Sequence, residues 1–279
     1  MDKTFWQGVA SNDYQIPESY TLAELGKELF SCLASTDPEL RDETAYIVYA
    51  NWMKRGMYSV DEIRANIAKL LANIETGIGE TDTDTVFLRS FSALLLAETV
   101  HNDNKKPFLS KEEVHHILDR ALAYLMSEQD PRGYVPVKGW AHALAHTADL
   151  LMVLGRNRHL DAADLGRILD GISEKLLHSS NHLYIHGEDE RLANAILQIL
   201  GRCLLPTEAV KAWIKSLLEP KENSWQDAFM DEARNRAFQN TRNLLRSVYL
   251  TLIASEMEIP ERGEIEKSFL DAAQNLSAF

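Results

Sequence analysis

The sequence is poor in the features that mark several large protein classes. Its two cysteines, Cys32 and Cys203, stand far apart and show no metal-ligand spacing, which excludes a disulfide framework or a cysteine-rich zinc module. We expect two free thiols in the core of a protein from a reducing compartment. The longest apolar runs, such as Ala93–Ala97, are far too short to span a bilayer. The start of the chain, Met1–Gln7, lacks the apolar stretch of a secretory signal, so we expect a cytoplasmic protein with no membrane contact.

Basic residues are also in short supply. Lysine and arginine number 29 against 42 aspartates and glutamates, which gives a net charge of −13. This balance argues against general nucleic-acid binding or attraction to anionic membranes, although local basic patches remain compatible with it. Hydrophobic residues make up 45% and charged residues 25%, as in an ordinary globular protein.

Strand patterns are nearly absent, since no hairpin signal and no sustained alternation of apolar and polar residues is found. Helical patterns follow one another instead. Four of them are amphipathic and begin at capping residues, namely Ser59, Ser110, Asp161 and the Pro206-Thr207 pair. Five others are richer in alanine, leucine and aromatics and carry thin polar stripes; they cover about 41–55, 83–101, 140–154, 188–203 and 234–256.

The five helices of the second kind recur roughly every 40–50 residues, which is typical of HEAT or armadillo arrays. We therefore predict an all-α fold, an α/α superhelix of HEAT/armadillo-like helix pairs, in a single domain over 1–279. One helix of each pair would line a concave face. A single α/α domain with non-repetitive packing is the alternative.

Four segments in order carry a family resemblance: TVFLRSFSAL at 85–94, RGYVP at 132–136, GWAHA at 139–143 and HGEDERLA at 186–193. Together they resemble the bacterial domain-of-unknown-function family 2785. The resemblance covers about 37–218, which leaves 219–279 as a C-terminal helical extension. It implies an all-helical, repeat-like fold and no activity.

The helix expected at 140–154 holds the first candidate site. His142, His146 and Asp149 fall within about 60° of each other on its surface, while most of its other positions are apolar. Two imidazoles and a carboxylate are suitable ligands for a divalent metal, although the glutamate of metalloprotease helices is replaced by Ala143. The alternative is a pair of hydrogen-bonded histidines that stabilises the fold. Trp140 beside them either walls a pocket or anchors the core.

The turn before the helix at 188–203 holds the second candidate. His186, Glu188 and Asp189 surround a glycine, and Arg191 follows within the first turn. These side chains either bind a ligand beside the histidine row or simply complement the positive end of the helix dipole.

Arginines on the five helices with thin polar stripes form the third candidate site. Arg89 lies on one stripe, and Arg236, Gln239, Asn243 and Arg246 lie on another. On a concave face they would bind a carboxylate, a phosphate or an acidic segment. Alternatively, they pair with acids of neighbouring helices.

The leading functional hypothesis is a helical-repeat protein whose concave face binds an anionic small molecule or an acidic partner segment, through nine residues: Arg89, Trp140, His142, His146, Asp149, His186, Glu188, Asp189 and Arg191. The second is a metal-assisted hydrolase with His142, His146 and Asp149 as metal ligands. The third is a structural adaptor without a pocket. The sequence does not decide whether the protein is an enzyme.

Overall fold

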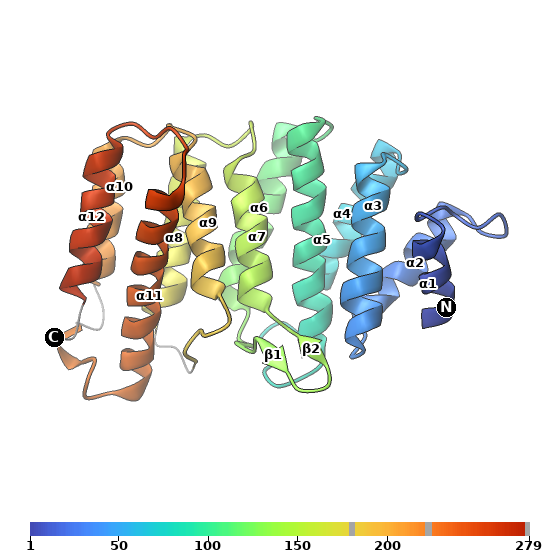
Figure 1. Ribbon diagram of the computed structural model, residues 1–279, viewed down its shortest axis with the longest axis horizontal. Coiled ribbons are helices and arrows are strands. Elements are labelled where there is room, and N and C mark those ends of the chain that lie inside the picture. The colour runs from blue at the N-terminus through green and yellow to red at the C-terminus, as the bar shows by residue number, and fades with distance from the viewer. Residues whose placement is uncertain (179–181, 221–224, 277–279) are drawn as a thin grey trace. The chain divides into compact units, whose positions relative to one another are not determined.

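The regular secondary structure of the chain is almost entirely helical in its computed structural model, which describes residues 1–178, 182–220 and 225–276 (Figure 1). Within these ranges it forms twelve α-helices, one π-helix, one 3-10 helix and a pair of two-residue strands. The all-α class predicted from the sequence is confirmed.

The elements follow one another with short connections. Their bounds are α1 (Lys3–Ser11), α2 (Leu22–Cys32), the π-helix η1 (Glu39–Tyr46), α3 (Ile47–Lys54), α4 (Val60–Asn73), α5 (Thr85–Lys105), α6 (Lys111–Ser127), β1 (Tyr134–Val135), β2 (Gly139–Trp140), α7 (Ala143–Gly155), α8 (Ala162–Leu177), α9 (Glu188–Leu200), α10 (Thr207–Leu218), the 3-10 helix η2 (Trp225–Asp227), α11 (Glu232–Ala254) and α12 (Arg262–Asn275).

Local capping fixes the starts of the amphipathic helices. Before α4, the Ser59 backbone N–H donates to the Glu62 carboxylate over 2.7 Å, and the Ser59 hydroxyl accepts the Glu62 N–H. Asp161 and Asp164 make the same reciprocal pair before α8. Each pair satisfies backbone donors that the first helical turn leaves without partners. Both helices begin one residue after the capping residue named from the sequence.

The chain divides into two compact units, one comprising 1–110 and 127–150 and the other 111–126 and 151–279. In the first unit, α5 packs against η1, α3 and α4, while α1 and α2 pack against η1. Helix α5 is therefore surrounded, which explains why its apolar residues cover nearly its whole circumference. The single continuous domain expected from the sequence remains a prediction.

In the second unit, α11 packs against α8, α9 and α12, and α10 packs against α8 and α12. Helix α6 lies beside α8, because Arg167 pairs with Asp119 at 2.6 Å and His115 with Asp164 at 2.9 Å. Figure 1 shows α9, α11, α12 and α10 in yellow to red.

A small hairpin before α7 was not predicted. Tyr134 pairs with Trp140 and Val135 with Gly139 in antiparallel register. The pairing continues to His142, whose N–H donates to the Arg132 carbonyl over 3.0 Å. It keeps the chain out of the helix as far as His142, so α7 begins at Ala143, three residues later than expected.

Two other expectations need correction. The first half of the helix predicted at 41–55 is the π-helix η1, not an α-helix. Both cysteines are free, as expected, but Cys203 is exposed and does not belong to the core. None of the described helices is long and apolar enough to cross a membrane.

The hairpin position generates a stability prediction at Gly139. Its backbone is left-handed (φ +77), and an added Cβ would lie 2.8 Å from the Pro38 Cβ. We expect Gly139→Ala to lower the free energy of unfolding by about 2–4 kcal/mol, because backbone strain and overpacking add. Urea unfolding followed by circular dichroism measures the loss.

Gly79→Ala is the matched control. Gly79 is also left-handed (φ +86), but an added Cβ would meet nothing within 4 Å. Gly79→Ala should therefore lower the free energy of unfolding by about 1 kcal/mol, because only the backbone strain contributes. Equal losses in the two variants would show that the contact with Pro38 does not matter.

Candidate functional site

The nine predicted ligand residues fall into both units. The first unit contains Arg89, Trp140, His142, His146 and Asp149, and the second contains His186, Glu188, Asp189 and Arg191.

Arg89 has a structural role on α5. Its side chain is fully buried and forms a two-pronged ion pair with Glu128, at 2.6 Å from Nε and 3.0 Å from Nη2. Nη1 donates to the carbonyls of Thr76 and Gly77 and to the Thr85 hydroxyl. These contacts match the alternative in which the arginine forms an ion pair within the protein, here with Glu128, which follows α6. A ligand does not reach this guanidinium.

His146 lies on α7 in a buried hydrogen-bond chain. The Ser90 hydroxyl donates to the Ala141 carbonyl, and the same oxygen lies 2.8 Å from His146 Nδ1. Since a hydroxyl has one proton, Nδ1 must be the donor in the second bond. In neutral His146, Nδ1 therefore carries the proton and Nε2 a lone pair.

A series of ring contacts, most of them edge-on, leads from His146 to the surface. His146 contacts Phe91 and His142, at centroid distances of 4.9 Å and 5.9 Å, and Trp140 stacks on His142 at 4.7 Å. Tyr134 in turn meets Trp140 edge-on at 5.2 Å. Tyr134 is 53% and Trp140 38% exposed, so the interpretation of Trp140 as a core anchor is wrong.

The helical row of His142, His146 and Asp149 is only partly formed. His142 precedes α7 with a left-handed backbone (φ +54), while His146 and Asp149 lie on the helix itself. Among the described residues, no three histidine, cysteine, aspartate or glutamate side chains are grouped so that they could hold a metal ion. The hairpin is the physical reason, because it holds His142 outside the helical register.

Arg41 is a buried residue that the sequence analysis missed. Its guanidinium donates to the carbonyls of Ser35 (2.7 Å) and Lys138 (2.8 Å), and so connects η1 to the hairpin. It also lies over the rings of Phe87 and Phe91, at 4.1 Å and 4.8 Å from their centroids. No local pattern could have revealed it, because the acceptors are backbone carbonyls and one of them is distant in sequence.

Asp42 is the carboxylate closest to this guanidinium, with Oδ1 at 2.9 Å from Arg41 Nε. Burial raises the pKa of Asp42 to about 6, although the positive charge of Arg41 opposes the shift. Burial likewise lowers the pKa of Arg41, and Asp42 opposes that shift. Desolvation therefore outweighs the attraction between the two charges.

In the second unit, the acids before α9 stabilise a turn. Gly187 is left-handed (φ +83), as its place in the predicted tight turn requires. The buried Glu188 accepts the His186 N–H over 2.8 Å, and Asp189 accepts the Ser247 hydroxyl of α11 over 2.5 Å. Arg191 is exposed. These contacts agree with the helix-start alternative for Glu188 and Asp189.

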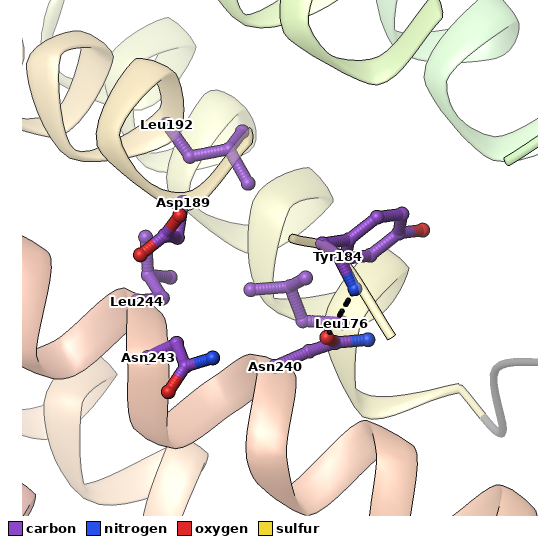
Figure 2. Close-up of a pocket in the computed structure, with 7 residues that line it drawn as sticks. All are labelled: Leu176, Tyr184, Asp189, Leu192, Asn240, Asn243 and Leu244. Atoms are coloured by element: carbon purple, nitrogen blue, oxygen red, sulfur yellow. Dashed lines mark hydrogen bonds between the residues drawn. The ribbon is translucent and has the colours of Figure 1, made fainter. Parts of the chain in front are cut away.

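A small pocket adjoins this turn between α8, α9 and α11 (Figure 2). Asp189, Leu192 and Leu244 lie on one side, and the Tyr184 N–H donates to Asn240 Oδ1 over 3.0 Å on the other. The space between the lining atoms has no room for a water molecule. An enclosed ligand at Asp189 would require the helices to move apart.

The basic stripe on α11 differs from its prediction. Arg236 pairs with Glu232, whereas Arg242 and Arg246 form no ion pair with any residue that the structure describes. Burial and the neighbouring charge of Arg246 lower the pKa of Arg242. Its Nε is buried and has no hydrogen-bond partner in the described chain. Two like charges thus lie one turn apart without a carboxylate partner among the described residues, although the Arg242 guanidinium lies 5.9 Å from the centroid of the Phe238 ring.

The raised pKa of Asp42 predicts a specific pH dependence. Its pKa is 3.8 in the unfolded chain and about 6 in the folded protein, so between these values the folded protein holds a proton that the unfolded chain has lost. The contribution of Asp42 to the free energy of unfolding therefore falls as pH rises through this window, by about 3 kcal/mol. Subtracting the unfolding free energy of Asp42→Asn at each pH isolates the effect.

Asp37→Asn is the control for that experiment. The hydrogen bond from Lys3 lowers the pKa of Asp37, so its contribution rises with pH and does so at lower pH. A wild-type minus Asp42→Asn difference that stays constant across the window would contradict the assignment.

The comparisons with known proteins show a family and name no activity. A family model described as a protein of unknown function, DUF2785, matches residues 74–250, which is more than half of the chain. The match includes all four segments that carry the resemblance, but it begins and ends later than the predicted span of 37–218. No curated protein and no solved structure matches the chain. The chain therefore belongs to the family of proteins of unknown function DUF2785.

Proposed function

We propose that this chain is a binding protein whose helix α11 takes up an acidic, amphipathic segment of a partner protein. The observation that carries the proposal is the uncompensated arginine pair, Arg242 and Arg246. In a chain of net charge −13, several other arginines have carboxylate partners, as Arg89 has Glu128 and Arg167 has Asp119. A negatively charged partner would relieve the repulsion at α11.

The same face of α11 continues with apolar side chains. Leu250 is 59% and Ile253 47% exposed, and both follow Arg246 along the helix. Positions 242, 246, 250 and 253 fall within about 80° around the helix axis. The face is therefore cationic at one end and apolar at the other, which suits a segment that presents carboxylates and apolar side chains one turn apart.

A surface contact fits the geometry better than an enclosed small molecule. The pocket between α9 and α11 has no room for a water molecule, while Arg246, Leu250 and Ile253 lie on the exposed side of the helix. Of the two anionic ligands expected from the sequence, the acidic segment is the one that we propose.

Other expectations remain part of this proposal. They are the HEAT- or armadillo-like α/α superhelix as a scaffold, a cytoplasmic location and the absence of nucleic-acid binding. The net charge supports the last of these. No observation favours the metal-assisted hydrolase.

The proposal is tested with a fluorescein-labelled peptide of about 16 residues that carries glutamates and leucines one helical turn apart. We expect saturable binding by fluorescence anisotropy and a loss of about tenfold or more for the double variant Arg242→Gln/Arg246→Gln. The affinity should fall as salt is added, because the contact is exposed.

The double variant Arg234→Gln/Arg236→Gln is the matched control. It removes the same charge from the same helix, but at arginines that already pair with Asp227 and Glu232. It should change the affinity by less than about threefold. Equal losses in both double variants, or equal binding of a peptide with lysines in place of the glutamates, would overturn the proposal.

A further inference from the structure

A groove in the first unit lies between α2 and α4, outside the residues matched by the family model. Its volume is about 320 Å³, which is within the range of small-molecule sites. Its walls are mainly apolar, with Leu22, Ala23, Gly26 and Phe30 on α2 and Ala65 on α4. The groove is therefore large enough for a small ligand with an apolar body.

Two buried donors in the wall have no hydrogen-bond partner within the described chain. They are Tyr58 Oη and Asn66 Nδ2, although Asn66 also lies close enough to the Tyr49 hydroxyl to oppose the rise of its pKa. Tyr58 is 8% exposed, and burial raises the pKa of its phenol, so the hydroxyl keeps its proton and remains a donor. Buried donors without acceptors are costly and uncommon, so an acceptor from outside the chain would stabilise this wall.

The charges at the groove favour an anion. Lys27 and Lys69 line it, and neither forms an ion pair with any residue that the structure describes. The one carboxylate in the lining, Glu62, is directed to the backbone and hydroxyl of Ser59, and these hydrogen bonds lower its pKa. The ammonium groups of Lys27 and Lys69 are therefore available to an anionic ligand.

Gly26 lines the groove without contributing a side chain. It lies within α2, where glycine destabilises the helix by about 1 kcal/mol relative to alanine. An added Cβ would lie 3.8 Å from Tyr58 Oη, an ordinary contact distance. The hydroxyl of Tyr58 is thus next to the space that Gly26 leaves.

We propose that this groove binds a small amphipathic carboxylic acid. The apolar body packs against Leu22 and Phe30, and the carboxylate lies between Lys27 and Lys69. Rotation of the partly exposed Asn66 side chain and of the Tyr58 hydroxyl brings their donors to a carboxylate oxygen. This binding site is separate from the proposed peptide contact on α11, because α11 belongs to the second unit.

The probe is octanoate, titrated into the full chain by isothermal calorimetry. We expect one saturable site, and binding of octan-1-ol at least about tenfold weaker, because the alcohol has the same body without the charge. Lys27→Gln/Lys69→Gln should weaken octanoate by about tenfold and leave octan-1-ol unchanged. Lys105→Gln/Lys106→Gln makes the same change of charge at the end of α5 and should have little effect.

Filling the groove tests its location. Gly26→Leu should abolish binding of both compounds, and Gly26→Ala should weaken it, while Gly8→Ala, which places a Cβ in open space on α1, should not. Circular dichroism checks that each variant is folded. If Gly26→Leu does not fold, Gly26→Ala and the lysine variants decide.

Three results would overturn the proposal. These are the absence of saturable octanoate binding, equal affinity for octan-1-ol, and normal octanoate binding by a folded Gly26→Leu protein. Loss of binding in the lysine variant but not in its control would support it. Because α11 is untouched by these variants, failure here leaves the peptide proposal standing.

Discussion

Arginine side chains that donate to loop carbonyls, two of them fully buried and one partly buried, join the helices of this chain to its loops. Arg41 connects η1 to the hairpin through the carbonyls of Ser35 and Lys138. Arg89 holds the carbonyls of Thr76 and Gly77, and Arg202 holds those of Gly155, Asn157 and Leu160 in the second unit. Loops pressed against helices have backbone acceptors that water does not reach, and a guanidinium with five donors can bind several at once. The hairpin, and with it the start of α7, depends on this interaction.

This role separates structural arginines from those available to partners. An arginine that is buried among carbonyls and paired with a carboxylate, such as Arg89, has no capacity for a ligand. Arg242 and Arg246 have neither kind of contact in the described chain, although acids greatly outnumber bases in the protein. The same reasoning distinguishes Lys27 and Lys69 at the groove between α2 and α4. At both proposed binding surfaces, basic side chains have no ion-pair partner among the described residues, although the protein as a whole is acidic.

The polar residues of α7 illustrate a different use of a buried polar strip. His146 donates to the Ser90 hydroxyl, which in turn donates to the Ala141 carbonyl at the end of the hairpin. The histidine thus ties α5, α7 and the hairpin together in the interior, where every polar group needs a partner. The ring series from His146 to Tyr134 then brings aromatic surface to the exposed edge of the hairpin.

The sequence by itself determined the helical class, the family and many helix starts, because capping residues and apolar periodicity act within a few residues of the positions they define. The tight turn at Gly187 and the helix starts after Ser59 and Asp161 are such local features. The tertiary structure alone decided which arginines are buried, where α7 begins and that η1 is a π-helix. The reason is that these depend on contacts between residues far apart in sequence, such as Arg41 with Lys138 and Gly139 with Pro38, which no local pattern encodes.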